Sequence, residues 1–276
     1  MQIGNLGAVK QMMSVASMEQ TNRQLRLTIE KLATGQRINR ASDDAAGLAI
    51  SEGLLTQVRG FKMASRNTQD AISALNIADG AGSETANILQ RQRELAGQAR
   101  NATLNDNDRK MLNQEFQQLN QELDRIAQAT NFNRQNLTNG QGLGSGNADI
   151  QVGANQGETI TVPRMDFTVA ATGMSGTDIS TAAGANAAFS SIDSAMNALG
   201  GQRSNIGAIS NRFESTINNL QTATVNTTAA ESLIRDQDMA LGIAEMLRNQ
   251  VLNKAASEAF SAFNRISSNH ILGLLR

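Results

Sequence analysis

The residue types that usually carry catalysis or metal binding are scarce in this sequence. His270 is the only histidine and there is no cysteine, so one chain cannot build a multi-histidine metal site, a thiolate site or a conventional serine triad. Two pairs of carboxylates could support acid–base chemistry, namely Asp43 with Asp44 and Asp236 with Asp238. Helix starts explain both pairs better, because acidic side chains stabilise the positive end of the helix dipole. We therefore predict that the chain is not an enzyme and needs no cofactor or metal.

Other ligand classes find equally little support. The Gly-rich segment 140–146 lacks the Lys followed by Ser or Thr that a phosphate-binding loop needs, and a flexible linker explains it better. Lys and Arg number 24 against 25 Asp and Glu and form no basic cluster, so we expect no nucleic-acid partner. No apolar run is long enough to cross a bilayer, and the opening residues lack a basic region followed by an apolar block. We therefore expect no membrane span and no conventional signal peptide.

The composition favours long helices over a compact sandwich or barrel. There is no Trp or Tyr, there is one Pro, and aromatic residues make up 3% of the 276 residues. Aromatic side chains normally supply much of the area that a core buries. This chain must therefore bury area through many small aliphatic contacts along extended elements.

The first expected helix, 6–34, carries a heptad seam of the kind found in coiled coils. Its seam positions alternate at spacings of three and four, with Asn22 as the polar exception. The apolar members are Val15, Met18, Leu25, Ile29 and Leu32. Gly35 is well placed to end this helix. Ser42 offers a cap for the next helix, with two Asp residues in its first turn.

Further helices and a small β element are predicted in the middle of the chain. One helix runs to about residue 100, although Gly80 and Gly82 weaken it. Another follows the capping turn 105–108 and should pack back antiparallel on its predecessor. Apolar alternation on both sides of 153–157 predicts a β-hairpin near 149–163 that ends at Pro163. A long heptad pattern then extends from 189 to 224.

The last helix is predicted to begin near Thr227 or Thr228 and to be apolar along one face. Its apolar residues include Ile243, Leu247, Val251, Phe260 and Phe263, followed by a tail that contains Leu274 and Leu275. Both ends of the chain are thus amphipathic helices that a monomer leaves without enough partner surface. Such surfaces build a helical filament when they are used head to tail without closure. A closed coiled-coil oligomer or adaptor is an alternative that periodicity alone leaves open.

One long stretch of sequence resembles a known family. The run from Leu32 to Ile50 reads LATGQRINRASDDAAGLAI and resembles the N-terminal signature of bacterial flagellins. The resemblance continues in further segments along the chain. These are Asn67, Asp70 and Ile72, then 88–96, Phe132-Asn133, 229–232, 234–236 and the closing Leu274-Leu275-Arg276.

The resemblance implies a mainly α fold of long antiparallel helical hairpins, or coiled-coil rods, with a small β-hairpin. Residues 1–42 and 235–276 would pair as the inner tube of a filament, and 43–234 would form the outer rod. Because 130–184 leaves room for little more than a hairpin and loops, the sequence looks like a short, core-only flagellin. The function implied is a structural subunit that polymerises through its terminal helices into the flagellar filament for swimming.

The resemblance also implies partners and a location. The subunit would be secreted through the flagellar type III export channel and would lie in the flagellum filament. Its partners would be other copies of itself, an export chaperone on the C-terminal helix, and the cap and hook-junction proteins. Arg91, Leu95 and Glu115 match the patch recognised by the flagellin-sensing Toll-like receptor, although packing also explains their helical spacing. Within the same resemblance, the alternative is the hook–filament junction protein, which forms a limited ring.

Overall fold

The computed structural model describes residues 2–142 and 146–274; for side chains, residues 2–8, 10, 11, 263, 264 and 266–274 are excepted. Long helices dominate it, and four short strands lie between the third and fourth helices. The elements are α1 (Gln2–Thr34), α2 (Ala45–Ala99), α3 (Asp106–Ala129), β1 (Asn131–Phe132), β2 (Gln135–Asn136), β3 (Ala148–Gln151), β4 (Thr159–Val162), α4 (Ala182–Arg235) and α5 (Met239–Leu274). The predicted fold class, mainly α with a small β element, is confirmed.

The chain divides into two compact units. One, the terminal unit, comprises 1–56 and 226–276, and the other, the central unit, comprises 57–225. The long helices α2 and α4 each contribute to both. The two units differ in how they bury apolar surface, and each is described by itself.

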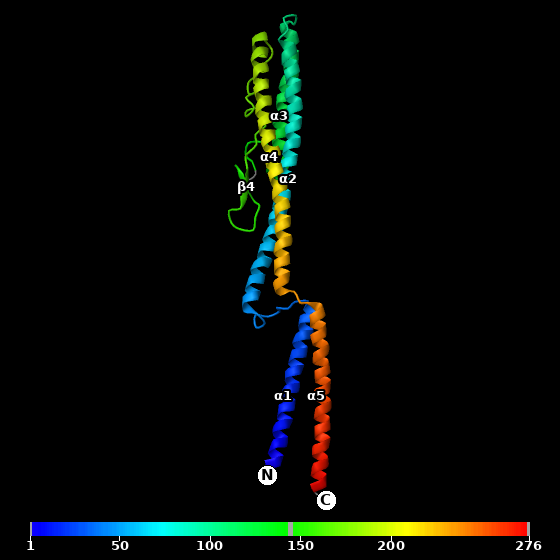
Figure 1. Cartoon of the computed structure of the whole chain (residues 1–276). Coiled ribbons are helices and arrows are strands. Elements are labelled where there is room, and N and C mark those ends of the chain that lie inside the picture. The colour runs from blue at the N-terminus through cyan, green and yellow to red at the C-terminus, as the bar shows by residue number, and fades with distance from the viewer. Residues whose placement is uncertain (1, 143–145, 275–276) are drawn as a thin grey trace. The chain divides into compact units, whose positions relative to one another are not determined.

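The central unit is a bundle in which α3 and α4 both run antiparallel to α2, and it has its own hydrophobic core (Figure 1). Its core combines many alanines with a few large side chains, which lets the helices approach closely. The largest fully buried side chains in it are Phe116, Phe167, Phe213, Leu75, Leu89, Leu95, Leu123, Leu137, Met174, Ile179 and Ile192. This agrees with an aromatic-poor sequence that buries area along the length of its helices.

Gly82 lies inside the unbroken helix α2, where the side chain of Arg203 needs the space that a Cβ would fill. The Cγ and Cδ atoms of Arg203 from α4 lie 3.2 Å from where a Cβ of Gly82 would be. The Arg203 guanidinium then reaches Asp79, with Nε 2.8 Å from Oδ1. The missing side chain therefore lets the arginine stem cross α2 and pair with its carboxylate.

The capping turn before α3 and the β-hairpin form where the sequence predicts them. Asn105 is the N-cap of α3, and its side chain and that of Asp108 bond each other's backbone N–H groups in a capping box. Strands β3 and β4 pair antiparallel with Ile150 opposite Ile160, and β4 ends immediately before Pro163. Proline stops the strand because it has no N–H for the ladder.

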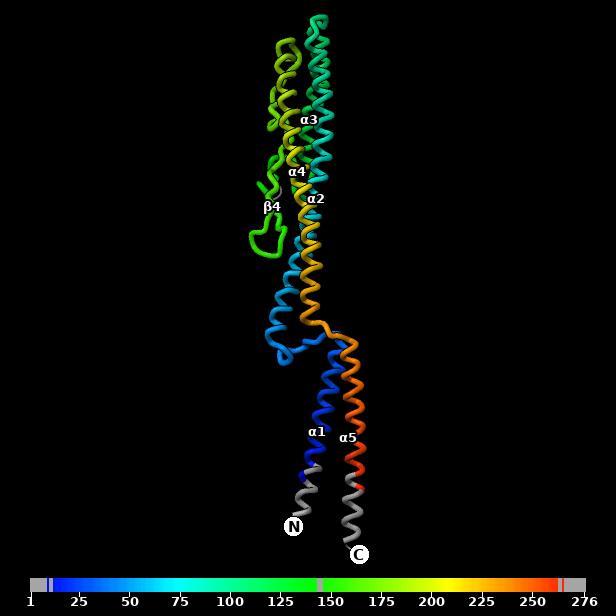
Figure 2. The backbone as a smooth tube through the Cα atoms, viewed as in Figure 1, coloured from blue at the N-terminus to red at the C-terminus, as the bar shows by residue number. Residues whose placement is uncertain are grey.

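In the terminal unit, α1 and α5 run side by side and antiparallel (Figures 1 and 2). The links that follow α1 and precede α5 are joined by backbone hydrogen bonds. The Arg37 N–H donates to the Arg235 carbonyl oxygen (2.7 Å), and the Gln237 N–H donates to that of Gly35 (2.9 Å). The Arg37 guanidinium also donates to the Ile234 carbonyl oxygen (2.6 Å), which satisfies one of the free carbonyls at the end of α4.

Two predicted helix starts are wrong. The N-cap of α2 is Asp44 rather than Ser42: its Oδ1 accepts from the Gly47 N–H (2.9 Å), and the helix begins at Ala45. The last helix does not begin near Thr227 or Thr228, because α4 continues to Arg235. Asp238 supplies the cap of α5 instead, with Oδ1 accepting from the N–H groups of residues 240 and 241 at 2.9 and 3.1 Å.

Threonine is a weak boundary signal in this chain because its hydroxyl can be satisfied inside a helix. Thr224, one turn before the predicted start, donates its hydroxyl to the Leu220 carbonyl oxygen four residues back (2.6 Å). A threonine bonded in this way leaves the helix uninterrupted. The pair of threonines at 227 and 228 therefore marks no end.

Asp43 closes the turn between α1 and α2. Its Oδ2 accepts from the backbone N–H groups of Arg40 (3.0 Å) and Asn39 (3.1 Å). These two hydrogen bonds, that of Arg40 first, hold the pKa of the Asp43 carboxyl below its ordinary value of 3.8. Asp44 and Asp238 cap helices, Asp43 closes this turn, and Asp236 accepts the Ser232 hydroxyl. The four carboxylates that could suggest acid–base chemistry therefore all have structural partners.

We predict that replacing Phe213 with alanine destabilises the central unit by about 3–5 kcal/mol, the usual cost of emptying a buried phenylalanine site. Phe213 is fully buried in the core, whereas Val225 on the same helix is 67% exposed. Val225→Ala is the matched control and should change stability by less than about 0.5 kcal/mol. Denaturant unfolding followed by circular dichroism measures both. Equal effects of the two substitutions would contradict the assignment of the core.

A second prediction concerns acid. Because the folded-state pKa of Asp43 is lowered, its contribution is present above the unfolded value of 3.8 and is lost as the pH falls through the lower, folded value. Hydrogen exchange should show the Asn39 and Arg40 amides protected at neutral pH and progressively unprotected below that value. Asp43→Ala should remove the protection at every pH. The Thr103 amide, which donates to the neutral Asn101 Oδ1 (3.1 Å), is the internal control. Parallel loss of protection at Thr103 would show general unfolding instead.

Candidate functional site

The seam between α1 and α5 is lined mainly by small or polar side chains. On α5 the inward positions repeat at spacings of four and three. They are Gly242, which is buried, and the half-buried Met246, Asn249, Asn253, Ala256 and Phe260. On α1, Met18, Asn22, Leu25 and Leu32 are half-buried and Thr28 is 9% exposed.

Two contacts fix this seam in detail. A Cβ on Gly242 would lie 2.7 Å from Cδ2 of Leu32, so the leucine packs directly on the α5 backbone. Further along, Asn253 Nδ2 donates a hydrogen bond to Asn22 Oδ1. The seam is therefore close-packed at one point and polar at another.

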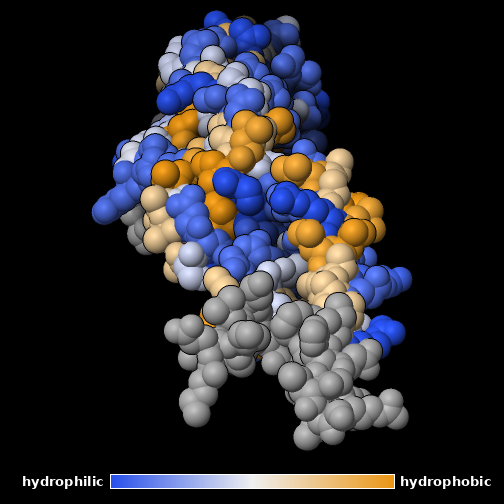
Figure 3. All heavy atoms as spheres, turned by 60° about the horizontal axis from the view of Figure 1, so that its bottom comes forward, coloured by the Kyte–Doolittle hydropathy of each residue, from blue (hydrophilic) through white to orange (hydrophobic). Residues whose placement is uncertain are grey.

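Many other large apolar side chains of the pair lie outside the seam and are exposed. Val251 is 67% exposed, Leu247 52% and Ile243 45%. The whole set is Val9, Met12, Met13, Val15, Leu27 and Ile29 on α1 with Met239, Leu241, Ile243, Leu247, Val251 and Leu252 on α5. We call it the exposed apolar rows. In Figure 3, hydrophobic residues lie in open patches on this end of the molecule.

The terminal unit consequently has almost no hydrophobic core of its own. Ile38 is the only hydrophobic residue that is buried among those whose side chains the structure describes in this unit. One side of the pair is instead a polar groove of about 430 Å³, lined by Ser17, Gln20, Thr21, Gln24, Glu245, Arg248 and Asn249. Exposed apolar rows of this extent beside a polar groove are typical of an interaction surface.

The structure separates the predicted terminal residues into two groups. Met18, Leu25, Leu32 and Phe260 lie half-buried in the seam. Val15, Ile29, Ile243, Leu247 and Val251 are exposed. The side chains of Phe263 and Leu274, and the whole of Leu275, lie outside the described residues.

Sequence reasoning missed the α5 seam because it followed the largest apolar residues. Gly242, Asn249, Asn253 and Ala256 do not stand out in a search for hydrophobic residues. They do keep the alternating four and three spacing, and this spacing was the signal available. The apolar row of α5 lies beside that seam and points outward.

The predicted receptor patch lies in the central unit. Arg91 of α2 donates from Nε and NH2 to Glu115 Oε1 of α3 at 2.9 and 2.8 Å, and from NH1 to Glu94 Oε2 at 3.1 Å. These partners, Glu115 first, raise the pKa of Arg91. Leu95 is 1% exposed and packs in the core. Arg91 and Glu115 therefore form the accessible part of this patch.

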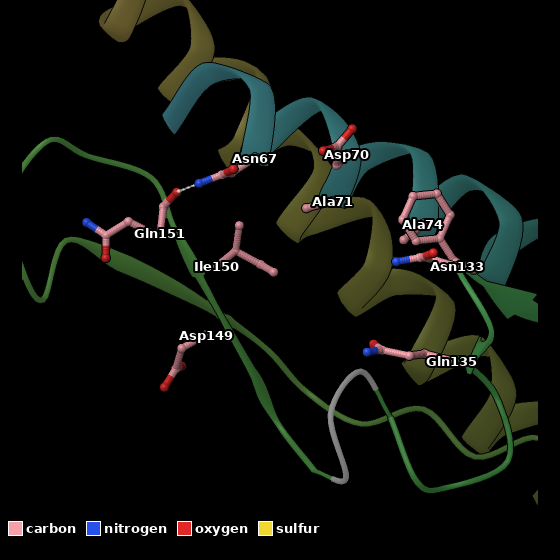
Figure 4. Close-up of a pocket in the computed structure, with 10 residues that line it drawn as sticks. Asn67, Asp70, Ala71, Ala74, Asn133, Gln135, Asp149, Ile150 and Gln151 are labelled. Carbon is pink, nitrogen blue, oxygen red and sulfur yellow. Dashed lines mark hydrogen bonds between the residues drawn. The ribbon is translucent and has the colours of Figure 1, made fainter. Parts of the chain in front are cut away.

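A groove of about 480 Å³ lies where the β-hairpin meets α2 (Figure 4). Its floor contains Ala71, Ala74 and Ile150, which belong to the core or pack against it. The Asn67 side chain donates to the Gln151 carbonyl oxygen across it (3.4 Å), and Asp149 accepts the Thr161 hydroxyl (2.6 Å). The first bond joins the hairpin to the helix and the second joins the two strands of the hairpin, so both polar contacts are structural.

The described residues offer neither a membrane span nor a metal site. No helix there is both long and apolar enough to span a bilayer. No three or more histidine or acidic side chains gather there in a way that could hold a metal ion.

Two family patterns match this chain. The bacterial flagellin N-terminal helical region matches residues 7–142, and the bacterial flagellin C-terminal helical region matches residues 189–275. Together they cover most of both units and leave out mainly the segment that carries β3 and β4.

Whole-length relatives point to the same family. The chain is 44% identical to a flagellin of Halalkalibacterium halodurans over 250 residues, which is 90% of each chain. It is 39% identical to a flagellin of Bacillus subtilis, over 90% of this chain and 91% of the relative. It is 38% identical to flagellin FlaB1 of Treponema pallidum, over 93% and 94%.

Solved structures agree. The crystal structure of Bacillus cereus flagellin is 34% identical, with a TM-score of 0.52 over 60% of this chain and 94% of that one. A putative flagellar hook-associated protein from Vibrio parahaemolyticus, at 14% identity and a TM-score of 0.58 over 70% and 99%, shares the fold. The chain belongs to the bacterial flagellins, which are non-enzymatic structural subunits of the extracellular flagellar filament.

Proposed function

We propose that the exposed apolar rows of the α1·α5 pair are the surface through which copies of this flagellin polymerise. The observation that carries the proposal is the distribution of side-chain size. Small and polar residues occupy about half of the seam positions within the chain, while the apolar side chains of Ile243, Leu247 and Val251 are exposed. Neighbouring copies would cover these rows in the filament, because nothing else in the described part of the terminal unit does.

The energetics favour this arrangement. Burying one such aliphatic side chain contributes about 1.5–3 kcal/mol relative to leaving it exposed. Several of them per copy add up to a favourable term of the size that association between proteins requires. In a filament the rows of one copy would meet a different surface of the next copy, and head-to-tail contacts of this kind give an open helical polymer when they do not close.

The domain roles follow from the same proposal. Residues 1–42 and 235–276 would form the inner tube of the filament, and 43–234 would form the outer rod. The support is the contrast in cores: the central unit has a filled core, whereas Ile38 is the only buried hydrophobic residue among the described side chains of the terminal unit.

Other partners would use the same helices before or during assembly. An export chaperone would cover the apolar row of α5 and so prevent premature association of copies. The filament cap and the hook-junction proteins would contact the ends of the growing polymer. The support is again the exposed row, which would promote association in the cytoplasm unless it were covered.

We also propose that the Arg91–Glu115 pair, with Leu95 beneath it, forms the patch recognised by the flagellin-sensing Toll-like receptor. The support is the exposure of both charged side chains on neighbouring helices. Leu95 would act by holding α2 and α3 in register, since its own side chain is buried.

Polymerisation is tested by adding a charge to the apolar row. Leu247→Glu or Val251→Glu should raise the monomer concentration needed for growth from sheared filament seeds at least tenfold, because one lost aliphatic burial is worth about 1.5–3 kcal/mol. Gln24→Glu, which adds the same charge on the polar groove, is the matched control and should polymerise normally. Sedimentation and electron microscopy measure the outcome. Normal growth of both α5 variants would refute the proposed surface, and discrete rings from the parent would favour a junction protein.

The receptor patch is tested separately. Arg91→Ala should lower activation of the flagellin-sensing Toll-like receptor in a reporter cell assay at least tenfold, because losing a charge-assisted contact costs about 1.5–3 kcal/mol. Arg125→Ala is the matched control, since Arg125 is also exposed and paired with a glutamate on the same bundle, Glu122. Similar signals from the two variants would argue against the patch.

A further inference from the structure

A hydrogen bond between two side-chain amides lies inside the α1·α5 seam. Asn253 Nδ2 of α5 donates to Asn22 Oδ1 of α1, and both residues are half-buried. Apolar residues would stabilise such seam positions more, so the pair lowers the stability that the seam could have. Asn22 is also the residue that interrupts the heptad pattern of α1.

The register of the pair is defined by this bond together with the Leu32–Gly242 contact. Asn22 lies opposite Asn253, and Leu32 lies opposite Gly242, ten residues further along one helix and eleven back along the other. Both contacts fit one antiparallel alignment. The same alignment places Met18 next to Ala256.

Heptad helices can slip by seven residues and keep a seam, so the alternatives can be enumerated. In one direction Asn22 would face Phe260 and Asn253 would face Ile29. In the other direction Asn22 would face Met246 and Asn253 would face Val15. Each slip therefore leaves two amides against apolar side chains with no partner, and an unsatisfied buried amide is costly.

We propose that the Asn22–Asn253 pair selects the register of α1 against α5, and with it the alignment of the exposed apolar rows. In the observed alignment, the pair stabilises the two helices less than two leucines would. In the slipped alignments the amides lose their partner, so the loss of stability is far larger and the observed alignment is favoured. Its consequence for assembly rests on the proposed function. A second copy can fit the rows of α1 and α5 together only when these are aligned in one way.

The absence of native cysteine makes the register directly measurable by disulfide trapping. Met18→Cys with Ala256→Cys reports the observed register. Leu25→Cys with Ala256→Cys reports a slip of one heptad, which moves the helices by about 10 Å, too far for both pairs to close in one register. Both pairs are placed in the full-length chain, in the parent background and in Asn22→Leu/Asn253→Leu, and are oxidised at a chain concentration at which circular dichroism shows the terminal helices to be formed.

In the parent, the in-register disulfide should exceed the slipped one at least tenfold under mild oxidation. In the double-leucine variant, the slipped disulfide should rise to a comparable yield while helix content by circular dichroism stays the same or increases. Asn249→Leu is the matched control: Asn249 is a half-buried seam asparagine that forms no side-chain hydrogen bond with any residue the structure describes. It should leave the parent preference unchanged.

Two results would overturn the proposal. One is equal trapping of both pairs in the parent, and the other is a double-leucine variant that still traps only the in-register pair. A charged replacement, Asn22→Asp with Asn253→Lys, gives a positive check, because it should suppress the slipped disulfide again. Sedimentation of the same chains without the introduced cysteines measures polymerisation separately from the register. A failure of the parent to polymerise would therefore count against the proposed function and not against the register.

Discussion

The terminal unit is governed by a shortage of apolar contact within its own chain. Two helices in contact can bury only one stripe each, and here that stripe is occupied by Gly242, Asn22, Asn253, Thr28 and a few larger residues. Leu247 and Val251 are left outside it. The hydrophobic effect acts on those side chains wherever a covering surface is available, and a second copy carries the same surface. In the proposed assembly, the seam would determine the geometry of the pair, and the rows outside it would provide the driving force for association.

The central unit shows the opposite solution with the same residue types. Three helices enclose a shared interior, so alanines such as Ala78 and Ala127 are fully buried and a small number of phenylalanines fill the remaining space. Arg203 can cross α2 because Gly82 leaves room for its stem. Close helix approach therefore replaces the aromatic area that most cores use. A unit with such a core is stable without neighbours, whereas the α1·α5 pair is not expected to be.

The sequence predicted the helices, the capping turn at Asn105 and the β-hairpin, because each follows from local chemistry. Periodicity, a capping box and a proline need no knowledge of the rest of the chain. Helix starts were harder. Asp44 rather than Ser42 caps α2 because Asp43 is used in the preceding turn, and α5 begins at Met239 because the residues before it pair with the link after α1. The first outcome depends on which of two adjacent aspartates the local turn uses, and the second depends on contacts between distant segments.

Only part of the candidate site could be predicted, because burial there also depends on contacts that the local sequence does not show. A heptad pattern marks every position that could be buried, but it does not identify the helix or chain that would cover each position. Val15 and Ile29 fit the α1 seam as well as Met18 and Leu25 do, yet they lie at its margin and remain exposed. On α5 the template selected the large residues, whereas Gly242 and Asn253 face the partner helix. A pattern of small and polar residues at heptad spacing, beside a row of large ones, indicates a helix with two different partners.

The two partners of α5 also link folding to assembly. If most of the apolar area of the terminal unit is covered only by other copies, its stability depends on their concentration, as for any protein that gains stability by binding. Dilute monomers would then keep readily unfolded ends beside a folded central unit, a state suited to passage through a narrow export channel. At the filament tip, where the neighbouring copies are fixed in place, the same helices would order as they bind. The polar Asn22–Asn253 pair matters most at that step, because rapid burial of apolar surface would otherwise trap slipped alignments of the two helices.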